Sequence, residues 1–170
     1  MDKNKIAQIW IESVLYTIIG LSIIGIVLAF VIPKVNESKD SIIVEQSITS
    51  LKQLDSKIND VARQKGNIGR IDFNIKRGYL YINSTGDRIT LVVDGLTSLY
   101  SESNVSISDG NLKILSMKGQ KTNTVYLTLD YELNITFNGK DDEKKITAAN
   151  LAYKLLIENK DNKIIDIRRG

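Results

Sequence analysis

The stretch SVLYTIIGLSIIGIVLAFVI, residues 13–32, carries no charged side chain over its twenty residues. At a helical rise of about 1.5 Å per residue it would span roughly 30 Å, the thickness of the hydrocarbon core of a membrane. A secretory signal peptide is the competing interpretation, but its apolar core usually has about 7–15 residues and ends at an Ala-x-Ala-like site. This run is longer and is followed by Pro33-Lys34. We therefore predict a membrane-spanning helix.

The flanking charges indicate how such a helix would be oriented. Lys3 and Lys5 precede it, which favours a cytoplasmic N-terminus, although Asp2, Lys34 and Lys39 weaken the signal. The bulk of the chain is then expected outside the cytoplasm.

A second helical pattern follows the apolar run. Pro33 lacks an amide hydrogen, so we expect a kink near this residue. Apolar side chains then recur every three or four residues, which predicts an amphipathic continuation over residues 34–65. The members of this stripe are Val44, Ile48, Leu51, Leu54, Ile58 and Val61. Lys65-Gly66-Asn67 is expected to end the helix.

Residues 66–170 change to the period of two that is typical of strands. Residues 79–83 and 88–94 flank Ser84-Thr85-Gly86-Asp87, a good hairpin turn. The longest alternation covers residues 125–137, and at about 3.3 Å per residue it would extend over roughly 43 Å, so we expect a bend or a switch between sheets midway. The predicted fold class is α+β: a long N-terminal helix and an antiparallel, β-sandwich-like domain of about seven to eight strands packed on its C-terminal half.

The composition restricts the chemistry. The chain has no cysteine and no histidine, which argues against disulfides, thiolate or zinc sites and histidine-based hydrolysis. We therefore predict that the protein is not an enzyme and has no catalytic residues, no cofactor and no metal. The 23 basic and 20 acidic residues are dispersed along the chain, so no nucleic-acid partner is indicated.

The order of features resembles archaeal type IV pilins and archaellins, which carry class III signal peptides. Lys5-Ile6-Ala7-Gln8 precedes Glu12, an uninterrupted apolar helix, a proline, an amphipathic helix and a β-domain. The resemblance covers residues 5–33 in motif and the whole chain in architecture. It implies that a membrane-bound prepilin peptidase cuts between Ala7 and Gln8. Residues 1–7 would then be a leader peptide, and the helix of residues 8–33 would polymerise into the core of a filament.

Glu12 has a physical role in this interpretation. A carboxylate among packed apolar helices is unfavourable unless it finds a partner. Cleavage before Gln8 would create an α-ammonium group one helical turn from Glu12, and a neighbouring subunit could offer that group to the carboxylate. Glu12 is therefore a candidate assembly residue. The alternative is an ordinary interfacial charge at the end of a membrane helix.

The expected function is that of a structural subunit of an extracellular homo-oligomeric filament, serving adhesion or motility. The protein would lie in the cell membrane as a single-pass protein before assembly and in the extracellular filament afterwards. The alternative is a single-span, membrane-anchored extracellular binding domain that does not polymerise. An outside location would also make N-glycosylation possible at four Asn-x-Ser/Thr sequons, at Asn36, Asn83, Asn104 and Asn134.

Overall fold

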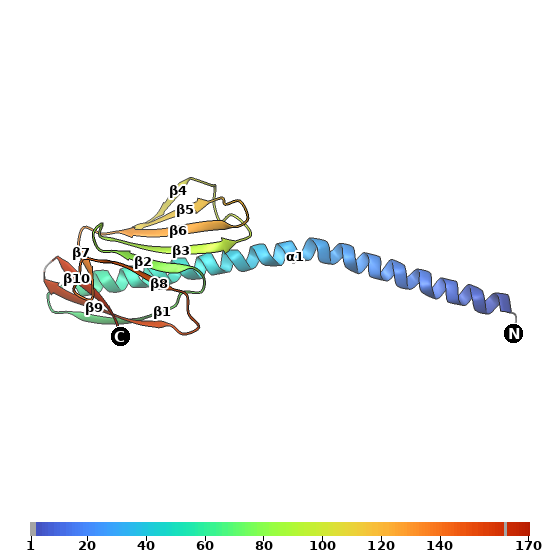
Figure 1. The fold of residues 1–170 in the computed structure, drawn as a ribbon, viewed down its shortest axis with the longest axis horizontal. Coiled ribbons are helices and arrows are strands. Elements are labelled where there is room, and N and C mark those ends of the chain that lie inside the picture. The colour runs from blue at the N-terminus through green and yellow to red at the C-terminus, as the bar shows by residue number, and fades with distance from the viewer. Residues whose placement is uncertain (1–2, 162) are drawn as a thin grey trace. The chain divides into compact units, whose positions relative to one another are not determined.

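The computed structural model describes residues 3–161 and 163–170, with residues 3–9 described only as part of a helix. Its contacts divide the chain into two units, Met1–Ser38 and Lys39–Gly170. One helix, α1 (Lys3–Ala62), runs through both units and is drawn from blue to cyan in Figure 1. Pro33 lies inside this helix, so the proline does not interrupt it. The kink that we expect near Pro33 stays a prediction.

The C-terminal end of α1 is fixed by a residue from late in the chain. The helix ends at Ala62, a few residues before the predicted stop, and Gly66 then adopts a φ of 81°. The side-chain amide of Asn159, which is only 1% exposed, donates to the carbonyl oxygens of Val61 and Ala62 at 3.3 and 3.1 Å. Asn159 therefore satisfies carbonyl groups that the end of a helix would otherwise leave without a partner.

The strands form two sheets, as Figure 1 shows. The four-stranded sheet has the order β1 (Ile68–Phe73), β9 (Tyr153–Asp161), β10 (Ile164–Arg169), β7 (Asn134–Phe137). The six-stranded sheet has the order β4 (Ser106–Asp109), β5 (Leu112–Met117), β6 (Asn123–Asp130), β3 (Arg88–Leu96), β2 (Tyr79–Asn83), β8 (Glu143–Thr147). The α+β class is thus confirmed, with more strands in the described residues than the seven to eight predicted. Neighbouring strands pair antiparallel except β10 and β7, which pair in parallel.

The long alternating run is divided between the two sheets. Its first part is β6 in the six-stranded sheet, and its last part is β7 in the four-stranded sheet. This confirms the switch expected from its length. Tyr131 and Leu133, in the short connection, pack against the core as partly buried side chains.

The two turns that the sequence predicts are present in the structure. β2 and β3 form the predicted hairpin, in which Asp87 has a φ of 48° and the amide of Gly86 donates to Asn83 Oδ1 at 2.9 Å. The predicted turn at Asn138 and Gly139 also has left-handed backbone angles, with φ of 53° and 71°. Such angles favour glycine and asparagine, which explains why these residues mark turns in the sequence.

The core forms where the stripe of α1 meets both sheets. Of the predicted stripe, five residues are buried and Ile48 is partly buried: the buried ones are Val44, Leu51, Leu54, Ile58 and Val61. They belong to one apolar cluster with side chains of both sheets, including Leu80, Leu127 and Leu155. The C-terminal half of the long helix is therefore the central element of the β-domain.

Candidate functional site

The first candidate site is the apolar half of α1. Large apolar side chains between Trp10 and Ile32 are exposed on every side of the helix, from 38% for Val14 to 72% for Phe30. Among the residues that the structure describes, α1 is the one helix long and apolar enough to cross a membrane, and none of its most apolar window is buried. Monomeric soluble proteins rarely expose apolar surface of this extent. The described residues therefore leave the apolar surface of this segment uncovered.

Hydroxyl groups within this segment bond to the helix that carries them. Thr17 Oγ1 donates to the carbonyl of Ser13 at 2.8 Å, and Ser22 Oγ donates to the carbonyl of Ile18 at 2.7 Å. A hydroxyl satisfied in this way can lie in hydrocarbon or between packed helices without an unpaired donor. Ser22 also lies near Gly25, where an added Cβ would meet nothing within 4 Å. This face would allow another helix to approach closely.

The predicted processing and assembly residues lie at the start of α1. Glu12 is exposed in the helix one turn after Gln8. The side chains of Ala7 and Gln8 lie outside the described residues, so the structure does not test the cleavage between them. The role of Glu12 in assembly likewise stays a prediction.

At the start of the second unit, a buried carboxylate holds α1 against the six-stranded sheet. Asp40 is 5% exposed and accepts hydrogen bonds from the Thr97 amide and hydroxyl, both at 2.6 Å, and from Arg77 at 2.9 Å. Desolvation raises the pKa of Asp40, but the hydrogen bonds from Thr97 and Arg77 and the charge of Arg77 together bring this pKa below its usual value. The periodicity of the stripe gave no sign of this contact, because Asp40 precedes the first apolar residue of the stripe.

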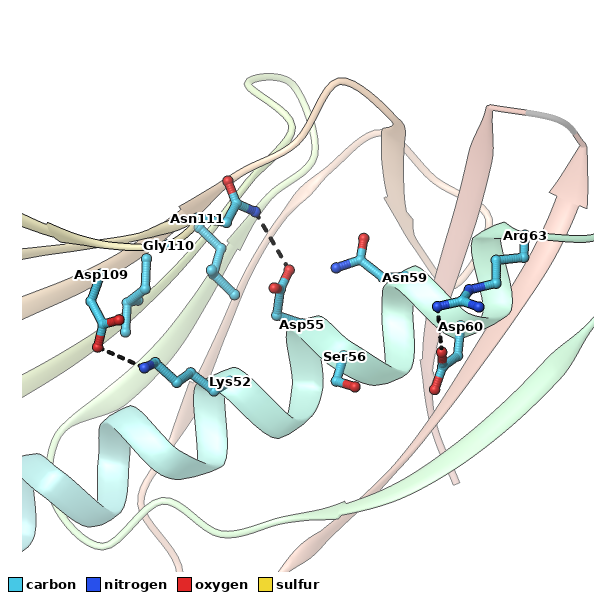
Figure 2. A pocket seen from close by; sticks show the side chains of 11 residues that line it. Lys52, Asp55, Ser56, Asn59, Asp60, Arg63, Asp109, Gly110 and Asn111 are labelled. Atoms are coloured by element: carbon cyan, nitrogen blue, oxygen red, sulfur yellow. Dashed lines mark hydrogen bonds and ion pairs between the residues drawn. The ribbon is translucent and has the colours of Figure 1, made fainter.

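A polar groove of about 460 Å³ lies beside the C-terminal part of α1 (Figure 2). Lys52 reaches across it to Asp109 at 2.6 Å, and Asp60 in the last turn of α1 pairs with Arg63, just beyond the helix, at 3.5 Å. Each of these charges therefore has a partner of the opposite sign.

Asp55 lies deeper in the same groove. It accepts hydrogen bonds from the phenol of Tyr131 at 3.0 Å and from the amide of Asn111 at 3.5 Å. Burial raises the pKa of Tyr131, and the negative charge of Asp55 and its hydrogen bond raise it further. The hydrogen bonds of Asp55 therefore join α1 to the β4–β5 turn through Asn111 and to the segment after β6 through Tyr131. We call these contacts the polar clamp.

The groove offers little for catalysis or metal binding. In the part of the chain that the structure describes, no three acidic, histidine or cysteine residues lie close enough to hold a metal ion. The expectations of no enzyme activity and no cofactor stay predictions. Sequence reasoning missed the groove, although Asp109-Gly110 between two short alternating runs is a recognisable hairpin signal.

The four sequons occupy different settings. Asn36, Asn104 and Asn134 are exposed, and Asn104 has a φ of 63° in the connection before β4. Asn83 is partly buried, and its side-chain oxygen already accepts the Gly86 amide. If the chain is glycosylated, the first three are the more accessible acceptors.

Comparisons of the chain with protein-family models, with curated proteins and with solved structures found no match.

Proposed function

We propose that the protein is a structural subunit of an extracellular, type IV pilus-like filament. Leader residues 1–7 are removed before Gln8, and the helix of residues 8–33 then polymerises with the same helix of other subunits. The observation that carries this proposal is the exposure of apolar side chains around the whole circumference of α1 between Trp10 and Ile32. A segment of this kind needs an apolar partner on all sides.

Two environments supply such a partner in turn. The chain has one long apolar N-terminal helix, which is compatible with a membrane anchor, and a bilayer covers it before assembly. In the filament, neighbouring helices of the same kind replace the lipid. The hydroxyls satisfied within the helix and the small residues Ser22 and Gly25 suit both environments.

In the proposed filament, Glu12 has a role that a simple anchor would not require. It is the last charged residue before the apolar run. In the filament core, the α-ammonium group of Gln8 on an adjacent subunit pairs with this carboxylate and sets the axial register of helices whose other contacts are nonspecific. The unit of residues 39–170, in which the β-domain of residues 66–170 covers its own part of the helix, is then displayed on the outside of the filament for adhesion or motility.

The intact mass and N-terminal sequence of the native protein test this proposal. We expect a chain that begins at Gln8, because a prepilin peptidase removes residues 1–7. Ala7→Phe should block removal by placing a bulky side chain at the scissile bond, whereas the small side chain of Ala7→Gly should permit it. A mature protein that retains Met1 would contradict the proposal. That result would favour the alternative, a single-span anchored extracellular binding domain that does not polymerise.

A further inference from the structure

The outer face of the six-stranded sheet carries an aromatic depression that plays no part in the filament proposal. Along β2, the buried residues Leu80 and Ile82 belong to the core, so the alternating residues Tyr79 and Tyr81 point to the other face. Tyr126 lies on the same face of β6, since its neighbours in sequence are core residues. Three tyrosines from two strands thus share one surface.

These rings lie around Val92, a buried residue of β3. Val92 pairs in register with Tyr79 on one side and with Tyr126 on the other. It is 4% exposed although it does not belong to the core cluster. Its cover must therefore come from its neighbours on the outer face. A depression of about 340 Å³ lies there, lined by Tyr79, Tyr81, Thr90, Val92, Tyr126 and Lys145.

The side chains around the depression include a positively charged and a negatively charged group. The ammonium group of Lys145 lies 3.7 Å from the centre of the Tyr79 ring. Hydrogen bonding to Glu143, with a smaller effect of its negative charge, raises the pKa of Tyr81. Further along the face, Asp130 is already paired with Arg88 and with Lys113. A positive and a negative group at the same rim do not select an ionic ligand of either sign.

The backbone leaves no polar group for a ligand on this face. β2 pairs with β3 and β8, β3 pairs with β2 and β6, and β6 pairs with β3 and β5. Contacts with a ligand are thus left to side chains: phenols, the carboxylate of Glu143, the ammonium group of Lys145, and the Thr90 hydroxyl, which lies 3.3 Å from that of Thr128. A peptide, whose amides need backbone or equivalent partners, is poorly matched to such a surface.

We propose that this depression is a binding site for a neutral saccharide. One apolar face of a pyranose ring packs on the tyrosine rings, and its hydroxyls, each a donor and an acceptor, bond to the phenols, Thr90, Glu143 and Lys145. The site does not depend on polymerisation. It gives the displayed β-domain a chemical class of ligand.

The test uses the full-length chain in a phosphocholine detergent, which contains no sugar. Maltotriose, cellotriose, mannotriose and N,N′,N″-triacetylchitotriose serve as neutral probes, trigalacturonate as an anionic probe and a proline-rich peptide as a further comparison. Saturation-transfer NMR detects binding, and calorimetry gives affinities. We expect at least one neutral trisaccharide to bind, and Tyr126→Leu to weaken it about tenfold or more, the loss expected when one stacking ring is removed. Leucine still covers Val92, so the sheet should stay folded.

Two variants separate stacking from structure. Tyr126→Phe keeps the ring and should retain most of the affinity, while Tyr16→Leu, at an exposed position in the apolar half of α1, should leave it unchanged. If Tyr126→Leu fails to fold by circular dichroism, Tyr81→Leu takes its place. Absence of binding by every neutral probe, binding that the tyrosine variants leave unchanged, or binding of only trigalacturonate or the peptide would each overturn the proposal. Because monomers suffice, a failure to form filaments would not affect this result.

Discussion

The two halves of α1 differ in where their apolar side chains find partners. Residues 13–32 are apolar on all sides and exposed, whereas residues 44–61 carry a single stripe that their own β-domain buries. One half therefore leaves its apolar side chains uncovered by the described chain, and the rest of this chain covers those of the other half. The comparison shows that the angular distribution of apolar residues, more than their number, decides whether a single domain can bury a helix's apolar surface.

Glu12→Ala should have the largest effect, and on assembly alone. In the proposed filament the change would leave the α-ammonium group of Gln8 unpaired among apolar helices, a penalty of several kcal/mol that should lower filament yield by about tenfold or more. Electron microscopy of cells that carry the variant measures this yield. Glu45→Ala, which removes an exposed carboxylate from the other half of the same helix, is the matched control and should assemble normally. Abundant normal filaments of the Glu12 variant would show that the carboxylate does not set assembly.

Leu54→Ala should act on the other half, and on folding. A fragment of residues 39–170 contains its own core, so we expect it to be soluble, monomeric and cooperatively folded. Within this fragment, removing the fully buried Leu54 side chain should lower the free energy of unfolding by about 2–5 kcal/mol in urea denaturation. Ile42→Ala, at a position 51% exposed on the same helix, should change it by less than about 1 kcal/mol. An aggregated wild-type fragment would mean that the boundary between the halves is misplaced.

Asp40→Ala tests the contact that begins the buried half. Losing the acceptor of Arg77 and Thr97 should lower the free energy of unfolding by about 1–3 kcal/mol at neutral pH. The folded-state pKa of Asp40 is lowered, so its stabilisation is present above the unfolded pKa of about 3.9 and is lost as the pH falls through the folded pKa. The difference between variant and wild type should therefore shrink below about pH 4. Urea denaturation at several pH values measures it, with Asp94→Ala, an exposed carboxylate, as control. A difference that does not change with pH would assign the loss to packing.

Tyr131→Phe should have the smallest effect, on the polar clamp beside α1. Removing the hydrogen bond to Asp55 should lower the free energy of unfolding by about 0.5–1.5 kcal/mol. The raised pKa of Tyr131 means that the folded state holds this proton more tightly, so wild-type stability should decline as the pH rises above about 10. The variant should lack this contribution to the decline. Tyr126→Phe, on the outer face of the sheet, is the control, and an equal effect of both changes would show that the Asp55 bond contributes nothing specific.

The sequence predicted several of the elements whose local pattern and burial agree. The stripe of α1, the β2–β3 hairpin and the division of residues 125–137 follow from periodicity, turn residues and length. β8 was missed because Glu143–Thr147 holds a single buried side chain, Ile146, and is a strand only through its pairing with β2. The parallel pairing of β7 with β10 has no local signal, since it joins residues about thirty positions apart.

The candidate sites also differ in whether the sequence alone could predict them. Glu12 and the Ala7–Gln8 bond can be proposed from the sequence, but the interactions that would test them involve a peptidase or another subunit. The groove and the tyrosine depression instead require the tertiary structure. Lys52 meets Asp109 only because α1 packs beside the β4–β5 turn, and Tyr79 and Tyr126 lie close together because their strands both pair with β3 at Val92.

The capping of α1 by Asn159 has a consequence for when the protein can fold. The two ends of this contact are 97 residues apart, and β9 and β10 follow every other strand of the described chain. At about 5–20 residues per second, a ribosome needs roughly 5–20 s to make that length of chain. Neither sheet has all its strands until β8 has been made, and the four-stranded sheet lacks β9 and β10 to the end of this interval. We therefore expect the capped end of α1 and the complete core around its stripe to form only after β9 has been made.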